Sequence, residues 1–265
     1  MRPTIFVFVL FLAGCSSIPP ARTSDLSRGE TVRVLILLYH HIQDLPGDAS
    51  DSLRRWTLTP AQFVEHMDWV AQQGFDVITM AQMNEHLNHG APLPAHPIIL
   101  TFDDGWKDNY TAVLPVLRKY RFSATFFITT ESVGHSAFVT WEELKAMSEQ
   151  GMDIQAHSVT HPHLTKLKDE AARREIEDSK KAIESRLGTA VVVFAYPFGN
   201  YSEKIISMVK DAGYESATIV SGNNLGYLYR ADRSYALSRI AIEGGNTVGD
   251  LAQSVREMKE NHVSY

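Results

Sequence analysis

Two short segments of the chain hold side chains that can bind a metal ion and move a proton. Residues 101–105 (TFDDG) place Asp103 and Asp104 directly after an apolar run, and residues 157–162 (HSVTHP) hold two imidazoles four residues apart. One carboxylate with two imidazoles is a common ligand set for a divalent ion, and a second carboxylate beside it can act as a base. These residues predict a hydrolytic metal centre.

Each segment also has a simpler explanation. Asp-Asp-Gly alone is more often a turn before a helix than a catalytic site, and one histidine among eleven is more often an ordinary surface or core residue. A pair of histidines that follows a strand and ends in proline is more specific. Pro162 disfavours helix at His161, so a loop that presents both rings inward is expected.

An alternation of strands and helices must position these segments. Continuous apolar, β-branched runs indicate strands buried on both faces, and capping boxes such as the one at Thr59 indicate helix starts. The predicted strands are residues 32–39, 75–80, 98–102, 124–128, 152–156, 191–195 and 215–220, and the predicted helices are 59–74, 81–88, 109–120, 140–151, 168–187, 202–212 and 248–259. About seven alternations favour a single α/β domain folded as a (β/α) barrel, with a doubly wound open sheet as the alternative.

In a parallel barrel, functional residues lie on the loops that follow the carboxyl ends of the strands. The polar clusters of this chain follow its predicted strands, so we expect them to converge on one face. The candidates at that face are Tyr39, His40, His41, Asp103, Asp104, His157, His161, Tyr196, Phe198 and Arg239.

The amino-terminal residues predict a targeting segment. Residues 1–14 have Arg2 and a short apolar core, and are expected to be a signal peptide. The string LAGC around Cys15 resembles a bacterial lipobox, which implies cleavage before Cys15 and its acylation; the alternative is a secretory signal with an incidental cysteine. Residues 15–30 then form a lipidated tether, and residues 31–265 form the domain. Since Ser16 and not Asp follows Cys15, the resemblance implies outer-membrane sorting in a Gram-negative cell.

Composition limits the partners and the source of stability. Cys15 is the only cysteine, so a protein lipidated there has no internal disulfide and depends on its hydrophobic core. The formal net charge is −6, or −7 once Arg2 is removed, which argues against a nucleic-acid partner.

The two motifs together resemble the polysaccharide deacetylases of carbohydrate esterase family 4, also called the NodB homology domain. TFDDG matches the family's first motif and HSVTHP its second, and the resemblance spans about residues 32–242. The resemblance implies a distorted (β/α) barrel of seven strands. It also implies a divalent metal, usually zinc with cobalt or nickel as alternatives, on Asp104, His157 and His161, and Asp103 as the base.

The resemblance implies further roles for the residues around this centre. Phe198, in residues 195–199 (AYPFG), matches the position whose backbone N–H donates to the oxyanion. Tyr196, Arg239, Tyr39 and His41 are the remaining candidates for contacts with the oxyanion or the substrate. Tyr39, Trp106, Tyr196 and Phe198 are candidates for a sugar-stacking surface, and core packing is an equally good explanation for each of them.

The chain departs from the family pattern at two positions. Ala195 stands where the third motif often has an arginine that orients the base, and Arg239 stands where the fifth often has a histidine that acts as the acid. A guanidinium can orient a carboxylate or bind substrate but is a poor proton donor, so His41, His40 and a water on the metal remain candidates for the acid.

The departures, with residues 38–42 (LYHHI), resemble the poly-β-1,6-N-acetylglucosamine deacetylases of biofilm export. An envelope enzyme facing the periplasm, with partners in an export system, is therefore expected. The alternatives are a deacetylase of chitin oligomers or peptidoglycan, and a catalytically silent carbohydrate-binding lipoprotein.

Overall fold

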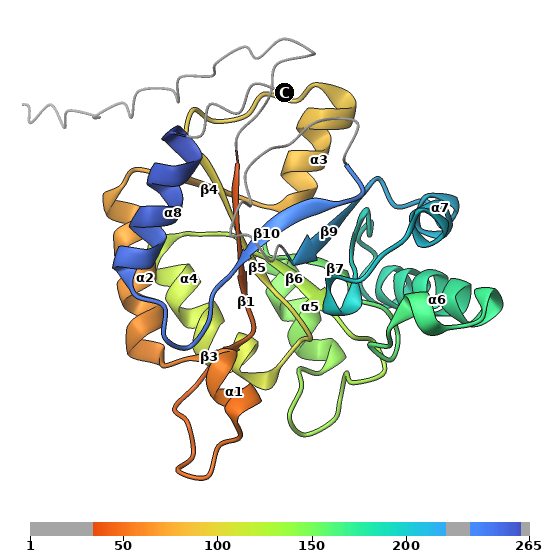
Figure 1. Cartoon of the computed structure of the whole chain (residues 1–265), viewed down its shortest axis with the longest axis horizontal. Coiled ribbons are helices and arrows are strands. Elements are labelled where there is room, and N and C mark those ends of the chain that lie inside the picture. Colours follow the sequence, from red (N-terminus) through yellow and green to blue (C-terminus); the bar gives the residue numbers. More distant parts are fainter. Residues whose placement is uncertain (1–33, 221–233, 261–265) are drawn as a thin grey trace, which may run out of the picture.

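Parallel strands close into a ring in the computed structural model, which describes residues 34–220 and 234–260 (Figure 1). Each strand pairs with the next around the ring, and the last pairs with the first. In pairing order the strands are β1 (Leu35–Tyr39), β5 (Pro97–Phe102), β6 (Thr125–Ile128), β7 (Asp153–Ala156), β8 (Val193–Ala195), β9 (Ser216–Val220) and β10 (Leu237–Ala241). The predicted single-domain barrel of seven strands is confirmed.

Strand β1 closes the ring because it pairs on both edges. Leu35 to Tyr39 match Ile98 to Phe102 of β5 in register, and Leu37 lies opposite Ile240 of β10. All five residues of β1 are buried, as expected for a strand with side chains on both faces covered. The open-sheet alternative is therefore excluded.

The strand predicted at residues 75–80 is shorter and lies outside the ring. Strand β4 (Asp76–Ile78) pairs with the first half of β5, and β6 pairs with the second half of the same edge of β5. It ends early because Thr79 caps the next helix through a capping box with Gln82.

Helices surround the barrel, with α2, α4 and α8 on one flank and α6 and α7 on the other (Figure 1). Capping boxes at Thr59 and Thr140 begin α2 and α5, as the sequence predicts. The described helices after β3 are α2 (Pro60–Gln72), α3 (Met80–His89), α4 (Leu114–Tyr120), α5 (Trp141–Glu149), α6 (Asp169–Leu187), α7 (Glu203–Asp211) and α8 (Val248–Glu260). None of the helices in the described residues is long and apolar enough to cross a membrane.

A small structure at one end of the barrel was not predicted. Strands β2 (His41–Ile42) and β3 (Thr57–Leu58) pair with each other, and α1 (Asp51–Arg55) lies between them in sequence. Ser50 begins α1 by accepting a hydrogen bond from the Leu53 N–H. This unit follows the carboxyl end of β1 and lies beside the functional loops.

Candidate metal and catalytic centre

The loops at the carboxyl ends of the strands form a cavity of about 560 Å³. Asp103 and Asp104 follow β5, His157 follows β7, and Tyr196 follows β8. The predicted residues that line the cavity are His40, His41, Asp103, Asp104, His157, His161, Tyr196 and Phe198. The structure thus brings most of the predicted site residues together.

Asp104, His157 and His161 offer three ligand atoms to one point. The Nε2 atoms of the two histidines are 3.0 Å apart, and each lies 3.6 Å from Oδ1 of Asp104. Ligands at zinc–nitrogen and zinc–oxygen distances from one tetrahedral ion lie about 3.3–3.6 Å apart, so the two carboxylate–imidazole distances match and the two imidazoles lie slightly closer together. The donor set and its spacing therefore fit a divalent ion, and this trio is the one cluster of that kind among the described residues.

The protonation of the two imidazoles also suits metal binding. Nδ1 of His157 lies 2.8 Å from the Ala195 carbonyl oxygen, which can only accept, so the proton is on Nδ1 and Nε2 keeps its lone pair. Burial, and then the neighbouring His157, lower the pKa of His161 to about 4. The neutral ring of His161 is thus available as a metal ligand near pH 7.

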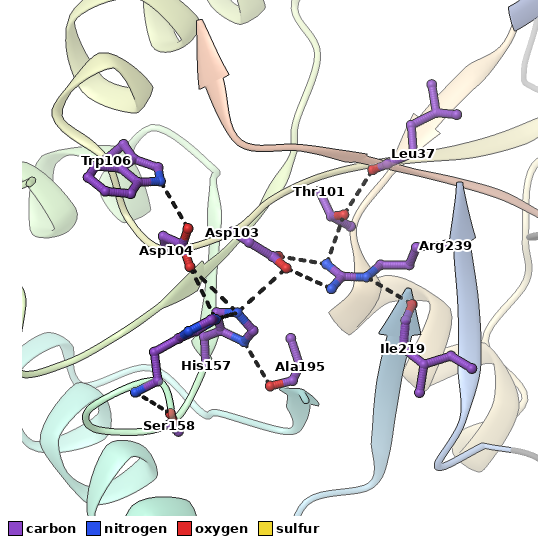
Figure 2. A network of polar contacts seen from close by, with 11 residues as sticks. Leu37, Thr101, Asp103, Asp104, Trp106, His157, Ser158, Ala195, Ile219 and Arg239 are labelled. Carbon is purple, nitrogen blue, oxygen red and sulfur yellow. Dashed lines mark hydrogen bonds and ion pairs between the residues drawn. The ribbon is translucent and has the colours of Figure 1, made fainter. Parts of the chain in front are cut away.

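Asp103 is held by a fully buried arginine. The Nη1 and Nη2 atoms of Arg239 donate to the two carboxylate oxygens at 2.6 and 2.7 Å, and Nη1 also contacts Thr101 Oγ1 at 3.2 Å (Figure 2). Burial alone would raise the pKa of Asp103, but Arg239 and then His157 outweigh burial and lower it to about 2. Asp103 is therefore an ionised carboxylate in one orientation.

Arg239, on β10, is the arginine that orients Asp103, although the position where the family often has such an arginine is occupied by Ala195. Position 195 holds alanine, and its carbonyl oxygen orients His157 instead. The expected role of Arg239 in substrate binding is wrong, because its side chain is completely buried and does not line the cavity. The expected alternative, orientation of a carboxylate, is the arrangement observed.

Tyr39 also lies away from the cavity. Its ring is completely buried, stacked on Phe102 at 5.2 Å and edge-on to Phe63 at 5.5 Å. The expectation of a substrate contact for Tyr39 is therefore wrong, and core packing explains it.

The loop that carries the second histidine is strained and externally supported. Ser158 and His161 have φ of 64° and 59°, values that non-glycine residues seldom adopt. Ser158 Oγ accepts a hydrogen bond from the His161 N–H at 3.0 Å. Glu175 of α6 accepts three more from Val159 and Thr160 at 2.7–2.9 Å. These bonds hold His161 in the position where it meets His157.

Two aromatic residues support the metal ligands from either side. The indole Nε1 of Trp106 donates to Asp104 Oδ2 at 3.0 Å, which leaves Oδ1 facing the histidines (Figure 2). The Phe198 ring packs edge-on against His161 at 4.5 Å and stacks on His163 at 4.0 Å. Phe198 has φ of 59° and is 54% exposed, so it stands at the cavity rim.

Several cavity residues were missed in the sequence. Ser50, Ser52, Leu53, Arg55 and Trp56, from α1 and its caps, form one wall. Residues 43–56 carry no helical periodicity long enough to reveal a five-residue helix, although Ser50 before Asp51 is an N-cap signal.

Comparison with known proteins places this fold and site in a class. A family model described as polysaccharide deacetylase matches residues 90–217. The deacetylase PplD of Streptococcus pyogenes, solved in complex with acetate, superposes with a TM-score of 0.77 at 25% identity, covering 85% of this chain and 99% of that one. The fold is a (β/α) barrel with a candidate metal centre, and residues 90–217 are similar to the polysaccharide deacetylase family, whose members generally depend on a divalent metal.

Two curated relatives align over most of the chain. The Bacillus subtilis protein YxkH is 29% identical over 224 residues, covering 84% of this chain and 76% of that protein. The poly-β-1,6-N-acetyl-D-glucosamine N-deacetylase of Escherichia coli K12 is 23% identical over 266 residues, covering 84% of this chain but only 38% of that protein. The relatives of this chain thus include a poly-β-1,6-N-acetyl-D-glucosamine N-deacetylase.

Proposed function

We propose that this protein is a metal-dependent hydrolase that removes N-acetyl groups from an N-acetylglucosamine polymer, poly-β-1,6-N-acetylglucosamine of biofilm. The observation that carries the proposal is the open trio of Asp104, His157 and His161 beside an ionised Asp103. The name of the Escherichia coli relative supports the choice of substrate. Zinc suits two imidazoles and a carboxylate, and cobalt or nickel can take the same ligands.

The described side chains supply the remaining needs of amide hydrolysis. A divalent ion bound to the trio would polarise the amide carbonyl and lower the pKa of a water molecule. Asp103, whose Oδ2 lies 3.7 Å from His157 Nε2, accepts the proton of the attacking water. Arg239 keeps that carboxylate charged and oriented. The backbone N–H of Phe198 donates to the oxyanion that develops.

A proton must also reach the departing amine, and we assign its donor to His40. His40 lines the cavity, and the charges that act on it are those of Asp103, Asp104, Arg239 and His157. Its neighbour His41 is occupied differently, because its Nδ1–H donates to Asp108 at 2.9 Å and its ring packs on Trp106. Burial lowers the pKa of His40, and the two aspartates partly oppose this effect.

Acetate release from defined oligosaccharides tests the proposal. The purified protein, with and without chelator and with zinc, cobalt or nickel restored, is assayed on β-1,6- and β-1,4-linked N-acetylglucosamine oligomers and on peptidoglycan fragments. We expect release that requires metal and is fastest on the β-1,6 oligomers. Faster release from β-1,4 oligomers or peptidoglycan would assign the substrate to chitin or the cell wall. Binding of oligomers without any release would contradict the enzyme and support a carbohydrate-binding lipoprotein.

We also propose that Cys15 anchors the protein to the membrane, facing the periplasm and, in a Gram-negative cell, on the outer membrane near a polysaccharide export system. The support is the sequence around Cys15 alone, which lies outside the described residues. Labelled palmitate should be incorporated into the wild type and not into Cys15→Ala. Equal labelling of the two proteins, or no labelling of the wild type, would contradict this anchor.

A further inference from the structure

Gln155 is a completely buried amide on the strand that leads into the metal site. It lies on β7 two residues before His157, and because side chains alternate along a strand, the two side chains face the same side of β7. Gln155 does not line the cavity. Its amide nevertheless makes three hydrogen bonds, and two of them cross to the neighbouring strand β8.

The oxygen of this amide serves the beginning of β8. Gln155 Oε1 accepts hydrogen bonds from the backbone N–H groups of Val192, at 2.9 Å, and Val193, at 2.8 Å. The ladder between the two strands is short, since β8 is paired with β7 at one position, Ala156 with Phe194. A buried backbone N–H without a partner is costly. The Gln155 side chain thus takes the place of ladder bonds at the start of β8.

A second link joins the same two strands at the metal site. Nδ1 of His157 donates to the Ala195 carbonyl oxygen at 2.8 Å (Figure 2). The bond from Val193 to Gln155 and the bond from His157 to Ala195 both span 38 positions of the sequence. Because parallel strands advance in step, a side chain that fixes Val193 opposite Gln155 also fixes Ala195 opposite His157.

The orientation of the Gln155 amide is fixed from its other end. Its Nε2 donates to Asp153 Oδ1 at 2.6 Å, which leaves Oε1 toward β8. Oδ2 of the completely buried Asp153 side accepts in turn from Thr125 Oγ1 at 2.8 Å and from the Ala81 N–H, in the first turn of α3, at 3.2 Å. Gln155 is therefore held in one orientation by a network that ends in the barrel wall and a helix.

We propose that Gln155 is a positioning residue of the metal centre, which places the Ala195 carbonyl and through it the His157 imidazole. The inference rests on the proposed function for the role of His157 as a metal ligand. The carbonyl keeps the proton on Nδ1 and directs Nε2 toward Asp104 and His161. Loss of the Gln155 acceptor releases the start of β8 and so changes the partner that orients this ligand.

Substitution of Gln155 tests the inference. Gln155→Met keeps the length of the side chain but removes the acceptor. Gln155→Asn is shorter by one methylene and keeps an amide beside Asp153, and it provides the same test if Gln155→Met does not fold. The control is Ser179→Ala, which removes a buried hydroxyl that donates to the Ile176 carbonyl at 2.9 Å on α6 and does not line the cavity.

Two measurements are made on each protein. Competition with a chromophoric chelator gives the affinity for metal, and nitrogen-15 NMR of the metal-free protein follows the ring N–H of His157. In the wild type this N–H should exchange slowly with solvent, because it is buried and bonded to Ala195. In both Gln155 variants we expect faster exchange of the ring N–H and metal binding that is about 10–100-fold weaker.

Ser179→Ala should unfold at lower urea than the wild type and yet keep wild-type metal affinity and a slowly exchanging His157 N–H. Wild-type affinity with an unchanged His157 N–H in the Gln155 variants would overturn the inference. Weaker affinity with an unchanged N–H, or an equal weakening in Ser179→Ala, would also overturn it, because the effect would then be a general loss of stability.

Neither measurement depends on acetate release, so the two proposals can fail separately. A wild type that binds metal but releases no acetate would refute the deacetylase, and the Gln155 variants would still decide the positioning role. Acetate release by the wild type, together with unchanged affinity and ring N–H in the Gln155 variants, would support the deacetylase and refute the role of Gln155.

Discussion

At the scale of residues, the centre depends on two neighbouring aspartates having different partners. Asp103 turns toward Arg239 and Asp104 toward the histidines, and this division is accompanied by a φ of 74° at Asp104. A buried carboxylate with a bidentate guanidinium stays charged, whereas the same carboxylate alone would take up a proton. The pairing makes Asp103 a base of constant orientation and leaves Asp104 free to bind a metal.

The Trp106 indole should raise metal affinity by orienting Asp104. Trp106→Phe keeps an aromatic ring against Phe138 but removes the Nε1–H donor, so we expect metal to bind about 10–100-fold more weakly. Competition with a chromophoric chelator measures this affinity directly. Trp141→Phe on α5, which does not line the cavity, is the control and should bind metal as the wild type does. Equal affinities for all three proteins would contradict the role given to Trp106.

The His40 assignment predicts a dependence on the leaving group. His40→Asn should lower kcat on N-acetylated sugars by about 10²–10⁴, the usual contribution of a general acid. The same variant should lose far less activity on an aryl acetate, whose leaving group needs no proton. His96→Asn, an exposed position before β5, is the control. An equal loss on both substrates would show that His40 is not the proton donor.

At the scale of elements, the sequence predicted what local patterns encode. The structure confirms the helix starts predicted at Thr59 and Thr140 and the buried strands β1 and β5. The short helix α1 was not predicted, because it is too short for hydrophobic periodicity, whereas the helix predicted at residues 109–120 is present and begins with the π-helical turn η1 (Asn109–Val113). The positive φ values of Asp104, His161 and Phe198 also have no local signal, since surrounding contacts impose them.

Helix α6 should stabilise the metal loop through Glu175. Glu175→Ala removes three hydrogen bonds to Val159 and Thr160, so we expect the free energy of unfolding to fall by about 1–3 kcal/mol and metal affinity to fall with it. Denaturant unfolding and chelator competition measure the two effects. Glu170→Ala, which breaks only an exposed pair with Arg174 on the same helix, should change neither by a measurable amount. Identical behaviour of the two variants would rule out this anchoring role.

At the scale of the whole molecule, closure of the barrel brings distant segments to one site. Arg239 reaches Asp103 across 136 positions of sequence because β10 pairs with β1, which pairs with β5. The sequence predicts a barrel from its alternation of elements but does not reveal which strands are neighbours. For this reason the metal ligands were recognisable as motifs, whereas the partner of the base and the burial of Tyr39 were not.

The buried ion pair should link stability to acid pH. Because the folded pKa of Asp103 is lowered to about 2, below its ordinary value of 3.8, its contribution to stability is present above pH 4 and is lost as the pH falls through about 2. Asparagine at this position has no such titration. In metal-free protein, the stability difference between the wild type and Asp103→Asn should therefore narrow from pH 4 to pH 2. Urea unfolding across this range measures the difference, and a constant difference would contradict the lowered pKa.

The division of labour between the two aspartates is tested most directly by one comparison. Metal content and acetate release are measured on purified Asp103→Asn, with Asp104→Ala beside it as the variant expected to lose the ion. Asp103→Asn removes the proton acceptor but leaves Asp104, His157 and His161 in place, so it should retain metal while kcat falls by at least about 10². Metal-loaded Asp103→Asn that releases acetate at the wild-type rate would contradict the account.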